Sequence, residues 1–203
     1  MYTTRTVVTA RGPARLHADG AGEALLVLGH GAGGGPDAPD LLSARDAALR
    51  CGWRVVRVEQ PWRVAGRRVA EAPRFLDEAW LDVLGSLSWP GPLVVGGRSS
   101  GARVACRTAQ TTGAAAVLAL AFPLQPARGP SRLPELLAPD VPRLVVQGAR
   151  DGFGVPPPCP GVRLELVDGA DHAFAVRRMD RRSSQEVLAQ VGAAVQRFLQ
   201  TVT

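Results

Sequence analysis

Four short apolar runs limit the folds open to this 203-residue chain more than any other feature. They read ALLVLG, LVVGG, VLALAF and RLVVQG, and apolar residues occupy consecutive positions in each. A strand of this kind needs apolar cover on both faces, as the strands of parallel sheets do. Stretches with the periodicity of amphipathic helices lie between the runs. This alternation predicts an α/β fold with a mostly parallel sheet and helices on both faces.

The pattern predicts eight strands and four main helices. We expect strands at residues 6–9, 14–17, 24–28, 54–58, 93–95, 115–121, 143–147 and 163–167. We expect helices at residues 40–51, 73–87, 100–111 and 184–199. The proline-rich segment 123–142 is the longest irregular region and is too short for a separate lid domain. The length and the lack of a linker predict a single domain over residues 1–203.

Composition argues against several classes of partner. The net charge is +6, but all 24 basic residues are arginines spread along the chain, without the aromatic interleaving of a nucleic-acid platform. The three cysteines, Cys51, Cys106 and Cys159, lack metal-ligand spacing, which predicts a reduced, cytoplasmic protein without a metal site. No apolar stretch is long enough for a signal peptide or a membrane span. We therefore expect no nucleic-acid and no membrane partner.

A nucleophile motif follows the second of the four apolar runs. The segment from Gly97 to Gly101 fits G-x-S-x-G with Ser99 at its centre, and a strand precedes it and a helix follows it. The glycines are needed because larger residues at these two positions would collide with strand and helix. Ser100 cannot be the nucleophile, since Arg98 stands where its preceding glycine would be. We expect Ser100 to offer its backbone N–H to an oxyanion instead.

A serine nucleophile on such a turn needs an acid and a histidine base, which follow it in that order. Three histidines are present: His17, His30 and His172. His172 comes after the last predicted strand, so order makes it the expected base. Asp151 comes just after the preceding strand and is the expected acid. Asp168 and Asp171 lie too close to His172 in sequence, although Asp171 could cap its loop.

The glycine cluster after the first apolar run has two interpretations. It formally contains the dinucleotide-binding pattern G-x-G-x-x-G at Gly29, Gly31 and Gly34, and Glu59 lies near the expected position of a ribose-binding acid. Prolines at positions 36 and 39 argue against it, because they delay the helix that must begin within the glycines. The other interpretation is an oxyanion loop, with the N–H of Ala32 as its donor.

The segments HGAGG, GGRSSGARVA, FPLQP, QGARDGFG and GADHAF resemble the α/β-hydrolase superfamily over nearly the whole chain. More narrowly, they resemble the small bacterial branch related to the testis-expressed and nonspecific-lethal-complex hydrolase-like proteins, with dienelactone hydrolases as more distant relatives. The resemblance implies a sheet of about eight strands with Ser99, Asp151 and His172 at its carboxyl edge. Dienelactone hydrolases use a cysteine nucleophile, so their substrate does not carry over. Some members of the branch are regarded as scaffolds, which keeps a non-catalytic interaction module as an alternative.

We accordingly predict a serine hydrolase that acts by acyl transfer on a small soluble ester or thioester, without a cofactor. Amides are equally compatible with the triad, and a dinucleotide-binding protein is a less favoured alternative. Four aromatic residues near strand ends could line an apolar acyl pocket: Trp62, Phe122, Phe153 and Phe174. Arg63, with Arg67 and Arg68 in the same loop, would suit a carboxylate or phosphate on the substrate. Arg98 could anchor the nucleophile turn through an ion pair. The sequence leaves the oligomeric state open.

Overall fold

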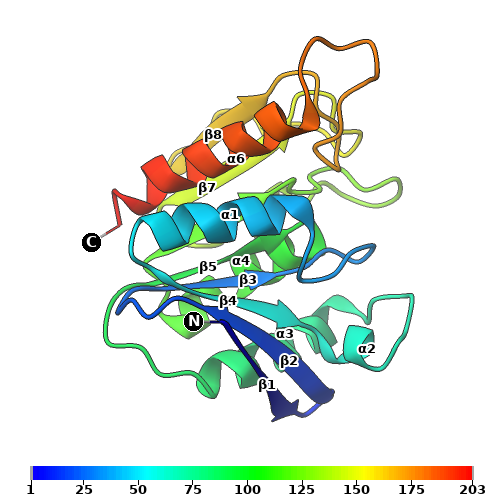
Figure 1. The fold of residues 1–203 in the computed structure, drawn as a ribbon. Helices are drawn as coiled ribbons and strands as arrows, with labels where there is room; N and C mark the ends of the chain where they lie inside the picture. The colour runs from blue at the N-terminus through cyan, green and yellow to red at the C-terminus, as the bar shows by residue number, and fades with distance from the viewer. Residues whose placement is uncertain (1, 203) are drawn as a thin grey trace.

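The computed structural model describes residues 2–202, which form an eight-stranded sheet covered by helices on both faces (Figure 1). The strands are β1 (Tyr2–Thr9), β2 (Gly12–Asp19), β3 (Leu25–Gly29), β4 (Arg54–Glu59), β5 (Leu93–Arg98), β6 (Ala116–Leu120), β7 (Arg143–Gly148) and β8 (Val162–Val167). Their order across the sheet is β1-β2-β4-β3-β5-β6-β7-β8. Strand β2 is antiparallel to both of its neighbours, and the remaining pairs are parallel. The predicted α/β-hydrolase fold, without a lid domain, is confirmed.

Four long helices and two short ones accompany the sheet. They are α1 (Pro39–Arg50), α2 (Pro61–Val64), α3 (Pro73–Gly85), α4 (Ser100–Thr112), α5 (Leu133–Leu137) and α6 (Ser184–Leu199). Helices α1 and α6 pack together on one face of the sheet, and α3 and α4 lie on the other (Figure 1). No helix formed by residues 2–202 is both long enough and apolar enough to cross a membrane.

The central strands bury both of their faces, which explains their continuous apolar sequences. In β3, Leu25 and Val27 belong to the core shared with α3 and α4. Leu26 and Leu28 belong to the core shared with α1 and α6. Successive side chains of a strand point to opposite faces, so a strand between two helical layers needs an apolar residue at every position.

The predicted strands and long helices are all present, with ends that differ by a few residues. The short helix α5 lies within segment 123–142, which the sequence predicts as irregular. Its Glu135 meets the guanidinium groups of Arg103 and Arg107 on α4, with nitrogen–oxygen distances of 2.7 and 3.0 Å. These long-range ion pairs help to hold a helix that is too short to be stable by itself.

The carboxyl edge of the sheet contains the strained backbone of the molecule. Within residues 2–202, three non-glycine residues have a positive φ: Ser99 at 52°, Ala121 at 48° and Phe174 at 55°. They follow strands β5, β6 and β8 respectively. Such conformations cost about 1–3 kcal/mol each and cluster at functional sites. The strain therefore marks this edge as the place to look for chemistry.

Candidate active site

Ser99 occupies a sharp turn between β5 and α4, with φ 52° and ψ −112°. The glycines on either side of it are required by the neighbouring backbone. A Cβ at Gly97 would lie 2.4 Å from the carbonyl oxygen of Gly29, and a Cβ at Gly101 would lie 2.2 Å from the same oxygen. Real Cβ atoms essentially never approach so closely. Strand β3 thus packs directly against both sides of the nucleophile turn.

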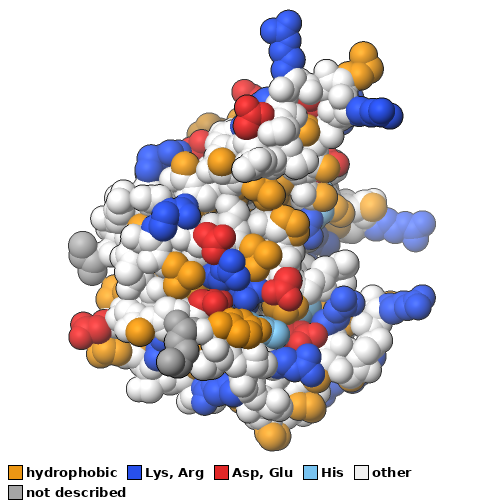
Figure 2. Space-filling model, viewed as in Figure 1, with side chains coloured by type: hydrophobic (Ala, Val, Ile, Leu, Met, Phe, Trp, Pro, Cys, Tyr) orange, Lys and Arg blue, Asp and Glu red, His pale blue; other side chains and the backbone are white. Residues whose placement is uncertain are grey.

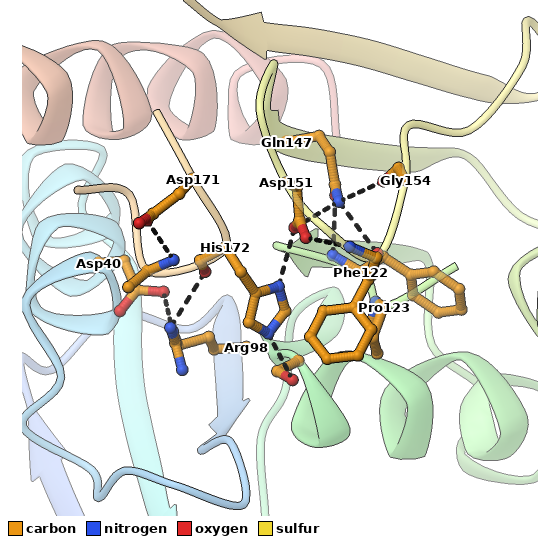
Figure 3. A network of polar contacts seen from close by, with 12 residues as sticks. Asp40, Arg98, Phe122, Pro123, Gln147, Asp151, Gly154, Asp171 and His172 are labelled. Carbon is orange, nitrogen blue, oxygen red and sulfur yellow. Dashed lines mark hydrogen bonds and ion pairs between the residues drawn. The ribbon is translucent and has the colours of Figure 1, made fainter. Parts of the chain in front are cut away.

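The structure brings together the three side chains predicted to form the triad. His172 Nε2 lies 3.0 Å from Ser99 Oγ, and His172 Nδ1 lies 2.8 Å from Asp151 Oδ2 (Figure 3). Asp151 follows β7 and is buried, while His172 follows β8. A neutral imidazole with its proton on Nδ1 donates to the carboxylate and accepts from the serine hydroxyl. That arrangement is the one a general base needs.

A buried glutamine that sequence reasoning missed holds the acid in place. Gln147, on β7, donates from Nε2 to Asp151 Oδ2 at 2.7 Å. The same nitrogen lies 3.1 Å from the carbonyl oxygen of Phe122 and 2.9 Å from that of Gly154, while Gln147 Oε1 accepts from the N–H of Phe122 at 2.8 Å (Figure 3). The N–H of Phe153 donates to Asp151 Oδ1 at 2.8 Å. The available signal was a polar residue inside the apolar run RLVVQG.

The two proposed oxyanion donors flank the nucleophile. Ser100 is the first residue of α4, and Ala32 lies in an exposed turn after β3. The turn comes close to the nucleophile, because a Cβ at Gly31 would lie 3.4 Å from Ser99 Cβ. The structure thus places the HGAG loop beside Ser99, as an oxyanion loop requires.

His30 helps to orient this loop, because both of its ring nitrogens make hydrogen bonds to the backbone. Its Nδ1 lies 2.9 Å from the carbonyl oxygen of Gly31, and its Nε2 accepts from the N–H of Gln60 at 3.1 Å. Burial lowers the pKa of His30, and the hydrogen bond to Gly31 only partly opposes this shift. The ring is therefore neutral, with its proton on Nδ1. Since the Gly31 carbonyl and the Ala32 N–H belong to one planar peptide unit, His30 sets the direction in which that N–H points.

The structure shows what Asp171 and the dinucleotide-like glycine pattern each do. Asp171 caps the loop of the base, since its Oδ1 accepts from the N–H groups of Ala173 and Ala175 at 2.8 and 3.0 Å. The first glycine cluster closes in a turn, and α1 begins only at Pro39. No helix N-terminus therefore lies within the dinucleotide-like pattern.

An open cleft of about 640 Å³ adjoins the candidate site, although Ser99, Asp151 and His172 are not among its lining residues. Six of its thirteen lining residues are charged, and its walls reach Arg98, next to Ser99, and Ala173, next to His172. Arg63 is exposed and also lines this cleft. The lining of this cleft is therefore mixed, with charged side chains among glycine, proline and alanine residues.

The structure does not gather the four aromatic residues expected to form an acyl pocket. Trp62, Phe122 and Phe174 are 2%, 0% and 2% exposed and pack in the two cores between sheet and helices. Phe153 alone is partly exposed, with its ring centroid 4.6 Å from that of His172. The expectation of a four-membered apolar pocket is thus corrected: a residue after a strand can turn into the core as readily as toward the edge.

Arginine side chains on the face shown in Figure 2 are scattered and interspersed with acidic ones. Several of them pair in the structure, such as Arg107 with Asp77 at 2.6 Å and Arg15 with Glu59 at 2.8 Å. Glu59, considered above as a ribose-binding acid, is therefore engaged by an arginine.

The fold is that of the α/β hydrolases, and comparison with known proteins agrees. The family model described as the alpha/beta hydrolase domain matches residues 22–200, so the chain belongs to that family. No curated protein sequence matches it.

Solved structures with the same fold include several serine hydrolases and esterases. XC6422 from Xanthomonas campestris, described as an α/β serine hydrolase without a lid, has a TM-score of 0.74 and 18% identity, over 97% of this chain and 94% of that one. A serine hydrolase homologue from Coxiella burnetii has a TM-score of 0.73 and 16% identity, over 97% of both chains. Est1E from Butyrivibrio proteoclasticus, with ferulic acid bound, has a TM-score of 0.70 and 14% identity, over 100% and 98%. At these identities the likeness is one of fold.

Proposed function

We propose that the protein is a serine hydrolase that works by acyl transfer, with Ser99 as nucleophile, His172 as base and Asp151 as its orienting acid. The observation that carries the proposal is the continuous chain of hydrogen bonds, 2.8 Å from acid to base and 3.0 Å from base to a serine held in strained backbone. A serine hydroxyl is a weak nucleophile until a base accepts its proton. Strain at such a turn keeps the hydroxyl exposed to substrate.

The proposed reaction proceeds in two halves. Ser99 Oγ attacks the carbonyl carbon while its proton passes to His172 Nε2, and Asp151 stabilises the imidazolium that forms. The N–H groups of Ala32 and Ser100 donate to the oxyanion. His172 then gives its proton to the leaving group, and water, activated by the same imidazole, hydrolyses the acyl-enzyme. No step requires a metal or an organic cofactor.

The substrate we propose is a small, soluble ester or thioester, and amides fit the same chemistry. The cleft is open, and charged side chains interrupt its glycine, proline and alanine lining, which suits a small soluble substrate better than a long acyl chain. Arg63 lines the cleft, and its guanidinium would suit a carboxylate or phosphate on the substrate. Phe153, packed on His172, is the aromatic residue positioned to contact the reacting group.

The proposal includes the domain organisation and the cellular location expected from the sequence. A single domain over residues 1–203 is supported by the continuous sheet and by the family match over residues 22–200. A cytoplasmic location is supported by three free cysteines: Cys51, Cys106 and Cys159.

The test compares Ser99→Ala with Ser100→Ala, two removals of one hydroxyl from adjacent residues. With p-nitrophenyl acetate as substrate, we expect Ser99→Ala to lose activity by more than roughly 10³-fold and to resist labelling by a fluorophosphonate. Ser100→Ala keeps its backbone N–H and should retain most of both. Full activity in Ser99→Ala, or a wild-type protein that neither hydrolyses the ester nor labels, would refute the proposal and favour a non-catalytic interaction module.

A further inference from the structure

Arg98, the residue before the proposed nucleophile, touches three other parts of the site. Its Nη2 donates to the backbone carbonyl oxygen of His172 at 3.1 Å, and its Nε lies 3.1 Å from Asp40 Oδ2 (Figure 3). Its Nη1 lies over the oxyanion loop, 3.1 Å from where a Cβ of Gly31 would be. The side chain is 15% exposed, so these contacts rather than solvent determine its conformation.

Asp40, the second residue of α1, is a buried carboxyl group that faces the guanidinium of Arg98. Its side chain is 4% exposed. Burial raises the pKa of the Asp40 carboxyl, and the charge of Arg98 is the largest influence that opposes this shift. A buried carboxylate without a partner is strongly destabilising, so the pair anchors the guanidinium to α1.

The hydrogen bond from Arg98 to His172 is one of the few contacts that tie the loop of the base to the nucleophile turn. His172 belongs to the irregular segment of residues 168–183 between β8 and α6. Among the hydrogen bonds found within residues 2–202, two join this segment to the turn between β5 and α4. One is the bond from His172 to Ser99 itself, and the other is the bond from Arg98 to the His172 backbone. Other ties, such as Arg150 Nη1 to the carbonyl oxygen of Gly169 at 2.9 Å, come from elsewhere.

We propose that Arg98, anchored by Asp40, is a positioning residue that fixes the backbone of His172 relative to Ser99. The inference rests on the proposed function. The ring of His172 is held on one side by Asp151, which sets its tilt, but its distance from Ser99 depends on where the backbone of residue 172 stands. The guanidinium links that backbone rigidly to the residue covalently bonded to Ser99. A displacement of about 1 Å between reacting groups can cost about 10²-fold in rate.

The rival role for Arg98 is direct binding of an anionic substrate group, because it also lines the cleft. The two roles affect kinetics differently. A positioning residue acts on every substrate, so its loss lowers kcat and leaves KM nearly unchanged, even for a neutral ester. A substrate ligand acts through KM, and only for substrates that carry the anion.

The experiment uses three variants of the full chain. Arg98→Gln removes the bond to His172 but leaves Asp40 buried without its cation. Arg98→Gln/Asp40→Asn removes that charge as well, so the fold should be recovered while positioning is not. Arg98→Lys keeps the charge opposite Asp40, but one ammonium on a flexible chain does not reproduce the fork that holds two acceptors. Each is assayed with p-nitrophenyl acetate and p-nitrophenyl hemisuccinate, by fluorophosphonate labelling rate and by thermal unfolding.

The matched control is Arg150→Gln, which removes a hydrogen bond from an exposed arginine to the backbone of the same segment. We expect Arg98→Gln/Asp40→Asn to unfold near the wild-type temperature, with kcat and labelling rate both lower by roughly 10- to 100-fold and KM within about twofold for both esters. Arg98→Lys should fall between it and the wild type, and Arg150→Gln should match the wild type in kcat. Wild-type kcat and labelling in the double variant, or a rise in KM confined to the hemisuccinate, would overturn the inference. A wild-type protein that neither hydrolyses the esters nor reacts with the fluorophosphonate would instead refute the proposed function.

Discussion

Adding one methyl group to Gly101 should disable the site without touching any proposed catalytic side chain. A Cβ at this position would lie 2.2 Å from the carbonyl oxygen of Gly29 and 2.5 Å from its carbonyl carbon. Both atoms are backbone of the central strand β3, so no flexible side chain can move aside. Ordinary contact requires about 3.4 Å, so α4 and β3 must separate by roughly 1 Å.

That separation acts on the hydrogen bond between Ser99 and His172, since Ser99 moves with the start of α4. We expect Gly101→Ala to lower kcat/KM for p-nitrophenyl acetate by about 10²-fold, and overpacking to lower the free energy of unfolding by about 1–3 kcal/mol. Steady-state hydrolysis measures the first quantity and urea denaturation the second.

Gly85→Ala is the matched control, because it places the same methyl group on helix α3 where no atom lies within 4 Å. It should leave activity unchanged and change the free energy of unfolding by less than about 0.5 kcal/mol, because Gly85 is the last residue of α3 and meets no neighbour. Wild-type activity and stability in Gly101→Ala would show that β3 does not constrain the nucleophile turn, and the steric argument would be refuted.

Two further predictions concern His30 and Arg63. Burial lowers the pKa of His30 from 6.5, so below about pH 6.5 the unfolded chain binds a proton that the folded protein does not, and the free energy of unfolding falls as the pH drops. We expect His30→Gln to show a smaller decrease in Tm between about pH 7.5 and pH 5.5 than the wild type, and equal decreases would contradict this. Arg63→Gln should lower kcat/KM for p-nitrophenyl hemisuccinate by roughly three- to fivefold and leave that for p-nitrophenyl acetate unchanged, whereas equal effects on the two esters would exclude an anion contact.

The sequence predicted the elements whose residues carry the pattern of burial. Strands β3, β6 and β7 are apolar at nearly every position because helices cover both faces, and their predicted ranges agree with the structure to within one residue at each end. The prediction for β5, residues 93–95, covers only its apolar half and stops before the glycines of the nucleophile turn. The first half of β1 was missed because it is an exposed edge strand, with the polar sequence YTTR and no apolar alternation. The short helix α5 was missed because ion pairs from α4 hold it, and no local periodicity encodes them.

The candidate site also contains residues that the sequence predicted and contacts that only the structure shows. Motif spacing and chain order sufficed to select Ser99, Asp151 and His172, since the fold returns each strand end to one edge of the sheet. The supporting contacts span large separations: Arg98 and His172 are 74 residues apart, and no spacing rule connects them. Gln147 lies in the apolar run RLVVQG and Asp40 at the start of α1, and only the packed structure shows which polar group each one faces.

The three residues with positive φ have a consequence for evolution in the laboratory. Ser99, Ala121 and Phe174 all stand at the carboxyl edge, where the chain adopts conformations that glycine or asparagine would accept more easily. We therefore expect selection for heat resistance alone to find gains at these positions. Selection for turnover would have to leave the same strain in place. Stability and turnover are therefore expected to conflict at the edge where we place the proposed active site.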